Sequence, residues 1–98
     1  MTTKEHILQT LKANKADLSE LGISAIGLFG SYIRNEQTPQ SDIDVLVDFE
    51  PEQETFDNFM AVYDKLEELF QNEVVEVVTR NGLSPNMGPR ILNEVEYV

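Results

Sequence analysis

The stretch from Gly27 to Glu50 constrains the fold more than any other, because it places two short polar motifs at the ends of two apolar runs. A Gly-Ser pair ending at Ser31 closes the first run, and after ten intervening residues an Asp-Ile-Asp triplet opens the second. Side chains alternate between the faces of a strand at about 3.3 Å per residue, so Asp42 and Asp44 would share a face with Cα atoms about 6.6 Å apart. Two carboxylates so placed can reach one hard cation.

Hydrophobic periodicity predicts helices and strands around that stretch. An amphipathic opening helix, capped by Thr2 or Thr3, is expected to continue to Gly22. A later helix, capped by Thr55 or Asp57, carries an aromatic-rich stripe that we expect to face the sheet. That stripe consists of Phe56, Phe59, Met60, Tyr63, Leu66, Leu69 and Phe70. The expected strands are Ile23–Phe29, Asp42–Phe49 and Val74–Thr79. Short helices are expected at Ser31–Asn35 and near Ile91, Leu92 and Val95.

The order of these elements predicts how the strands are arranged. A short connection makes the first two strands antiparallel neighbours, so the Gly-Ser turn would lie beside Asp42 and Asp44. A helical crossover makes the second and third strands parallel, which brings Glu76 toward the same edge of the sheet. Asp48 has the same parity as the two aspartates, but it is expected at the far end of its strand, next to an acidic loop.

The Gly-Ser pair, the ten-residue spacing and the Asp-x-Asp triplet together resemble the signature of polymerase-beta-type nucleotidyltransferases. From about Ile23 to its end, the chain is most similar to the minimal (MNT-type) members, which are commonly antitoxin partners of HEPN-domain ribonuclease toxins. The resemblance implies an α+β fold, a small mixed sheet of three to four strands with helices packed on it. Residues 1–98 are expected to form a single domain, whose site a second polypeptide or a second copy would complete.

The same resemblance implies the role of each site residue. Asp42, Asp44 and Glu76 would be the catalytic carboxylates that hold Mg²⁺, with Mn²⁺ as the alternative. Gly30, Ser31 and Arg34 would bind the triphosphate of ATP. Simpler roles remain open: Gly30 can make a turn, Ser31 can cap a helix, and Arg34 can pair with Glu36 on the surface. His6 is expected to be an exposed residue without a ligand role.

Charge and composition restrict the partners and the compartment. Eighteen acidic residues against seven basic ones give a net charge of -11, which disfavours binding to nucleic acid. The acidic excess either keeps the protein soluble or matches a basic partner. The absence of cysteine leaves metal binding to oxygen ligands and favours magnesium or manganese over zinc. No apolar run is long enough to span a membrane, and we expect a cytoplasmic protein.

Two residues depart from the pattern of the family. Glu76 occupies the position of an Asp, and its extra methylene moves the carboxylate by about 1.5 Å. Asn35 occupies the position of a Gly, which a left-handed backbone would allow. The leading hypothesis is transfer of AMP from ATP to a HEPN-type toxin. The alternatives are a non-catalytic antitoxin that masks its partner by binding, and nucleotidyl transfer to a small molecule.

Overall fold

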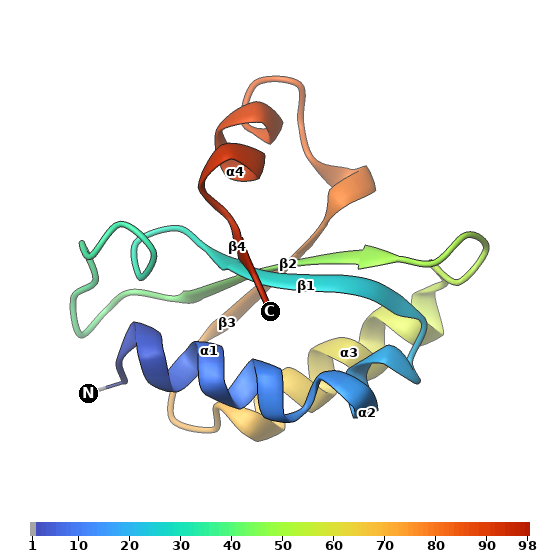
Figure 1. Ribbon diagram of the computed structural model, residues 1–98, viewed down its shortest axis with the longest axis horizontal. Coiled ribbons are helices and arrows are strands. Elements are labelled where there is room, and N and C mark those ends of the chain that lie inside the picture. The colour runs from blue at the N-terminus through green and yellow to red at the C-terminus, as the bar shows by residue number, and fades with distance from the viewer. Residues whose placement is uncertain (1) are drawn as a thin grey trace.

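A four-stranded mixed sheet organises residues 2–98, the part of the chain that the computed structural model describes (Figure 1). The strands are β1 (Ile23–Phe29), β2 (Ile43–Phe49), β3 (Val75–Thr79) and β4 (Glu96–Tyr97), in the spatial order β3-β2-β1-β4. β1 pairs antiparallel with β2, and β2 pairs parallel with β3, so both predicted pairings are confirmed. The α+β architecture is confirmed as well.

The fourth strand is a finding of the structure. β4 pairs antiparallel with β1, with Gly27 opposite Tyr97 and Leu28 opposite Glu96. The close approach requires a glycine, because a Cβ on Gly27 would lie 2.7 Å from Val95 Cγ2 and 2.8 Å from the Glu96 carbonyl oxygen. A two-residue strand carries too little alternation to be recognised from sequence.

The predicted opening helix is two helices, α1 (Lys4–Ala13) and α2 (Lys15–Ser19). Thr3 caps α1, as one of the two predicted alternatives, by accepting a 3.1 Å hydrogen bond from the His6 N–H. The break lies at Asn14, whose backbone leaves the helical region with φ -106° and ψ 9°. Its side-chain amide donates to the Thr10 carbonyl at 2.8 Å, a local bond by which Asn competes with helix continuation.

Two hydrophobic layers lie on opposite faces of the sheet (Figure 1). α1, α2 and α3 (Phe56–Leu69, capped by Thr55) cover one face, and α4 (Gly88–Glu94) lies over the other. Alternate residues of β2 divide between the faces: Val45 and Val47 join the larger cluster, whereas Leu46 packs with Phe29 and Ile91. The strand alternation therefore puts Asp44 on the α4 face, where a cleft can form.

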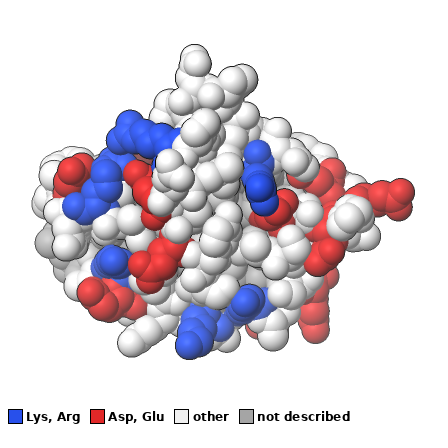
Figure 2. All heavy atoms as spheres, turned by 45° about the horizontal axis from the view of Figure 1, so that its top comes forward, with Lys and Arg blue, Asp and Glu red and all other residues white. Residues whose placement is uncertain are grey.

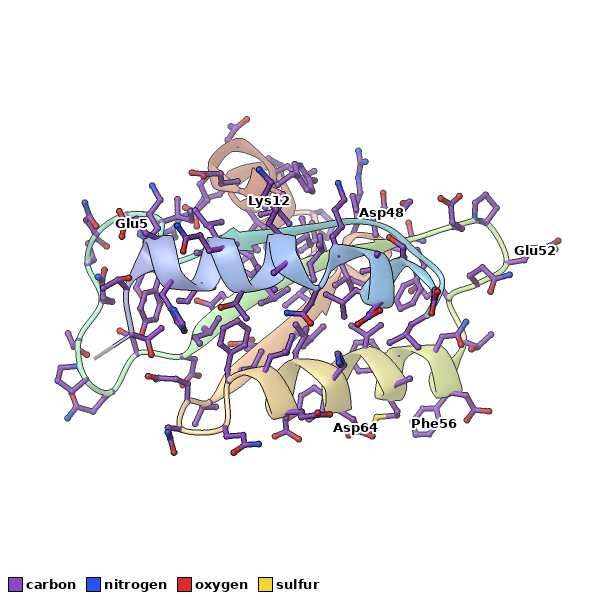
Figure 3. The ribbon with its side chains drawn as sticks, turned by 60° about the horizontal axis from the view of Figure 1, so that its bottom comes forward. Glu5, Lys12, Asp48, Glu52, Phe56 and Asp64 are labelled. Atoms are coloured by element: carbon purple, nitrogen blue, oxygen red, sulfur yellow. The ribbon has the colours of Figure 1, made fainter. Side chains whose placement is uncertain are left out.

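Two local expectations are wrong. Residues 31–35 form consecutive turns instead of a helix: the Arg34 N–H donates to the Gly30 carbonyl at 3.1 Å, and Asn35 then adopts a left-handed φ of 58°. Phe56 does not join the sheet-facing stripe, because it begins α3 and is 77% exposed. Figure 3 shows its ring directed away from the sheet. The left-handed backbone that would allow Asn35 in place of Gly is present, and the exposure expected of His6 is confirmed.

No helix in the described part of the chain is long and apolar enough to cross a membrane.

Candidate active site

The end of β1 and the start of β2 meet at a glycine whose missing side chain shapes the site. Gly30 has a left-handed φ of 83°, and a Cβ added there would overlap the Asp44 carboxylate. The register pairs Phe29 with Asp44, which brings the Gly30 turn directly beside that carboxylate. Gly30 thus serves two purposes, since it turns the chain and leaves room for Asp44.

Asp44 and Glu76 are opposite each other on the parallel strands β2 and β3. Burial, then the charge of Glu76 and a hydrogen bond with it, then the charge of Asp42 raise the pKa of Asp44 from 3.8 to about 7, while Arg34 opposes the shift. Carboxyl groups brought this close favour a shared proton or a cation between them. The predicted pairing of these two acids at one sheet edge thus appears in the structure as a register pair.

Asp42 and Ser31 occupy less central positions than the other candidates. Asp42 lies one residue before β2 and is exposed, although its charge still acts on Asp44. Ser31 follows Gly30 directly and is partly buried. Neither residue is among those lining the cleft, which has a volume of about 290 Å³ and is lined by Phe29, Gly30, Arg34, Asp44, Glu76, Val78, Met87, Arg90, Ile91 and Glu94.

Arg34 forms one wall of this cleft and makes two carboxylate contacts. Its Nε donates to Glu36 at 3.0 Å, which is the surface ion pair considered from the sequence. Its Nη1 donates to both carboxylate oxygens of Glu94 at 3.0 Å. Figure 2 shows basic and acidic side chains interspersed on the left of the surface, the side on which Figure 1 places the β1–β2 connection.

The sequence analysis missed the part of the cleft that α4 contributes. Arg90 and Glu94 both line the cleft and lie four residues apart, so they share one side of this short helix. That spacing is visible in the sequence, but it is common on exposed helices and points to no particular ligand. The spacing of Arg90 and Glu94 points to the cleft only once the position of α4 over the sheet is known.

The carboxylates present suit a hard divalent cation in their chemistry. Asp44 and Glu76 offer oxygen ligands side by side, and Asp42 is an exposed acid close enough to influence Asp44. Mg²⁺ takes such ligands and completes its shell with water and phosphate oxygens. Within residues 2–98, no three His, Cys, Asp or Glu side chains are already grouped to hold a metal ion. A metal site would therefore use the Asp44–Glu76 pair and draw in the exposed Asp42 side chain.

The raised pKa of Asp44 predicts how the stability of the metal-free protein depends on pH. A carboxyl that titrates higher in the folded state than in the unfolded state loses stability as pH rises from about 4 to about 7. Asp44→Asn removes this titration. Because solvent screens the half-buried carboxyl, we expect the variant to gain only about 2 kcal/mol over wild type at pH 8 and little at pH 4. Urea unfolding in EDTA at several pH values measures the difference; a constant difference would contradict the assignment.

A sequence profile for a nucleotidyltransferase domain matches residues 8–98 of the chain. The chain belongs to the nucleotidyltransferase domain family. This confirms the predicted family and enzyme class.

Relatives and solved structures agree with this membership. The nucleotidyltransferase is 39% identical over 99 residues to protein adenylyltransferase MntA of Thermococcus cleftensis, with 100% of this chain and 98% of the relative covered. A solved structure of a proposed minimal nucleotidyltransferase matches with a TM-score of 0.82 at 27% identity, over 97% of this chain and 95% of the other. A crystal structure of a toxin–antitoxin with AMP-PNP shares the fold, with a TM-score of 0.66 at 21% identity, over 98% of this chain and 72% of the other.

Proposed function

We propose that this nucleotidyltransferase transfers AMP from ATP to a partner toxin of the HEPN class and thereby neutralises it. The observation that carries the proposal is the cleft in which the Asp44–Glu76 pair lies beside two anion-binding donors, the Gly30 N–H and Arg34. The similarity to a protein adenylyltransferase supports AMP as the transferred group. The fold shared with a toxin–antitoxin that contains AMP-PNP supports ATP as the donor and a toxin as the partner.

In this reaction, an acceptor oxygen forms a bond to the α-phosphorus of ATP, and the bond from that phosphorus to pyrophosphate breaks. The Gly30 N–H and Arg34 bind the phosphates, together with the hydroxyl of Ser31, which follows Gly30 in the chain. Asp42, Asp44 and Glu76 would hold Mg²⁺, or Mn²⁺ in its place, and Glu76 would accept the proton that the acceptor loses. A cation held there would supply neutralisation of the negative charge on the phosphates.

The size and charge of the surface fit a protein acceptor. A cleft of about 290 Å³ is at the lower limit for a ligand site, so it suits the phosphates and leaves the rest of the nucleotide at the surface, open to a partner. The net charge of -11 favours a basic partner over a nucleic acid. Acidic side chains also gather at the right-hand side of Figure 2, the side on which Figure 1 places the β2–α3 connection with Glu50, Glu52 and Glu54.

Radioactive ATP with the label at either of two positions tests the proposal. After incubation with Mg²⁺ and a HEPN-type toxin, α-labelled ATP should label the toxin and γ-labelled ATP should not. The reason is that AMP retains only the α-phosphorus. Labelling from γ-labelled ATP would indicate a kinase. Tight binding to the toxin without any labelling would instead support the non-catalytic antitoxin.

A further inference from the structure

The donors assigned to the phosphates already hold a carboxylate of the chain itself. Glu94 Oε2 accepts a 2.6 Å hydrogen bond from the Gly30 N–H. The same carboxylate accepts from Arg34 Nη1 at 3.0 Å through each of its oxygens. The Glu94 side chain is only 16% exposed, so these contacts are partly shielded from water. Its carboxylate thus occupies the place where a phosphate oxygen would meet both donors.

The local structure of α4 does not account for this position of Glu94. Glu94 is the last residue of the helix, and no basic residue lies in the last turn. A negative charge at the C-terminal end of a helix is unfavourable, because the carbonyl dipoles there are negative. The hydrogen bonds to Gly30 and Arg34 offset that cost, and charge-assisted bonds of this kind are among the strongest in proteins. Glu94 is therefore held by the anion-binding donors and not by its own helix.

We propose that Glu94 is an internal competitor for the triphosphate subsite, which must leave the Gly30 N–H and Arg34 when the phosphates of a nucleotide bind. The inference rests on the proposed function for the identity of the anion. One N–H cannot donate fully to two anions, and a carboxylate left beside a triphosphate would repel it. The resident contact thus lowers the affinity for any ligand that uses these donors. It also keeps the Gly30 N–H paired while no ligand is bound.

The opposite role makes the opposite prediction. If Glu94 only positioned Arg34 for the phosphates, its removal would weaken ligand binding. Glu94→Gln separates the two roles, because it keeps the length of the side chain and removes its charge. Glu36→Gln is the matched control: Glu36 also accepts from Arg34, but it is exposed and makes no contact with Gly30 among the described hydrogen bonds.

Calorimetric titrations with magnesium AMP-PNP and with inorganic tripolyphosphate test the competition. Glu94→Gln should bind both ligands about five- to tenfold more tightly than wild type, since a neutral acceptor holds the donors about half as strongly as a charged one. Glu36→Gln should bind them as wild type does. Unchanged or weaker binding by Glu94→Gln would overturn the proposal. Glu94→Asp is the second variant, and its shorter side chain should give an intermediate gain.

Thermal melts distinguish competition from a purely structural contact. Without ligand, Glu94→Gln should melt below wild type, because a charge-assisted contact is lost. With saturating tripolyphosphate, its melting temperature should rise further than that of wild type, because the tighter complex is stabilised more. An equal rise in the two proteins would overturn the proposal.

The failure of this inference can be told apart from failure of the proposed function. Tighter tripolyphosphate binding by Glu94→Gln in a protein that labels no partner would support the competition and reject adenylylation. A labelled partner together with unchanged tripolyphosphate binding by Glu94→Gln would support adenylylation and reject the competition. If neither wild type nor Glu94→Gln bound either ligand, both would be rejected.

Discussion

Replacing Asp44 with Asn should lower the rate of AMP transfer by at least about a hundredfold, because even residues that only support a metal ligand cost 10- to 100-fold when they are removed. Asp44 is the group on which the other site features converge. It is paired with Glu76 in the β2–β3 register, and its carboxylate fills the space that a Cβ on Gly30 would need. The charges of Glu76, Asp42 and Arg34 all shift its pKa. Asn keeps the shape but removes the charge that would hold a cation. Initial rates of partner labelling at saturating ATP measure the loss.

Asp48→Asn is the control for this variant. Asp48 lies on the same strand and face, about 13 Å further along, and pairs with Arg80 at 3.6 Å. Its replacement removes the same charge without touching the cleft, so the labelling rate should stay within about twofold of wild type, as expected for a distant surface ion pair. An equal loss in both variants would mean that overall charge, and not the position of Asp44, sets the rate.

Gly30→Ala should both destabilise the protein and impair catalysis. The left-handed backbone costs an alanine about 1–2 kcal/mol, and its Cβ would overlap the Asp44 carboxylate, so we expect a loss of roughly 2–4 kcal/mol in the free energy of unfolding. Displacing Asp44 by even 1 Å should cost about a hundredfold in rate. Urea unfolding measures the first effect, and partner labelling at a temperature where the variant is folded measures the second.

Gly88→Ala tests whether any added methyl group would have this effect. Gly88 begins α4 without a left-handed φ, and a Cβ there would meet Leu83 Cβ at 3.4 Å, an ordinary contact. The free energy of unfolding should stay within about 0.5 kcal/mol of wild type or rise slightly, since alanine loses less backbone entropy on folding. If Gly30→Ala were equally well tolerated, the close packing of Gly30 against Asp44 would not matter to the site.

Prediction from sequence succeeded where the relevant physics is local or follows from short connections. The continuous, partly β-branched apolar run at Ile23–Phe29 predicted β1, and the short β1–β2 connection and the α3 crossover predicted the antiparallel and parallel pairings. It failed at Asn14, where one side-chain hydrogen bond to Thr10 breaks a helix whose apolar spacing continues across the break. Two-residue β4 is defined only by its pairing with β1.

The candidate site was also predicted from the sequence only in part. Gly30, Arg34, Asp44 and Glu76, all chosen from the sequence, line one cleft. The sequence could not predict that Asp42 and Ser31 lie outside the lining of the cleft. Ser31 follows β1 and Asp42 precedes β2, and strand alternation no longer fixes the direction of a side chain there. The roles proposed for all six residues remain predictions that the variants above test.

The sequence by itself determined the family, the two central pairings of the sheet and the acids that meet at one edge, because these follow from motif spacing, alternation and connection length. Only the tertiary structure decided what closes the cleft. Glu94 is 64 residues from Gly30 in the chain, and the two meet because α4 packs over the sheet through Ile91, Phe29 and Leu46. A contact of that range depends on the packing of the whole α4 face, which no local pattern records.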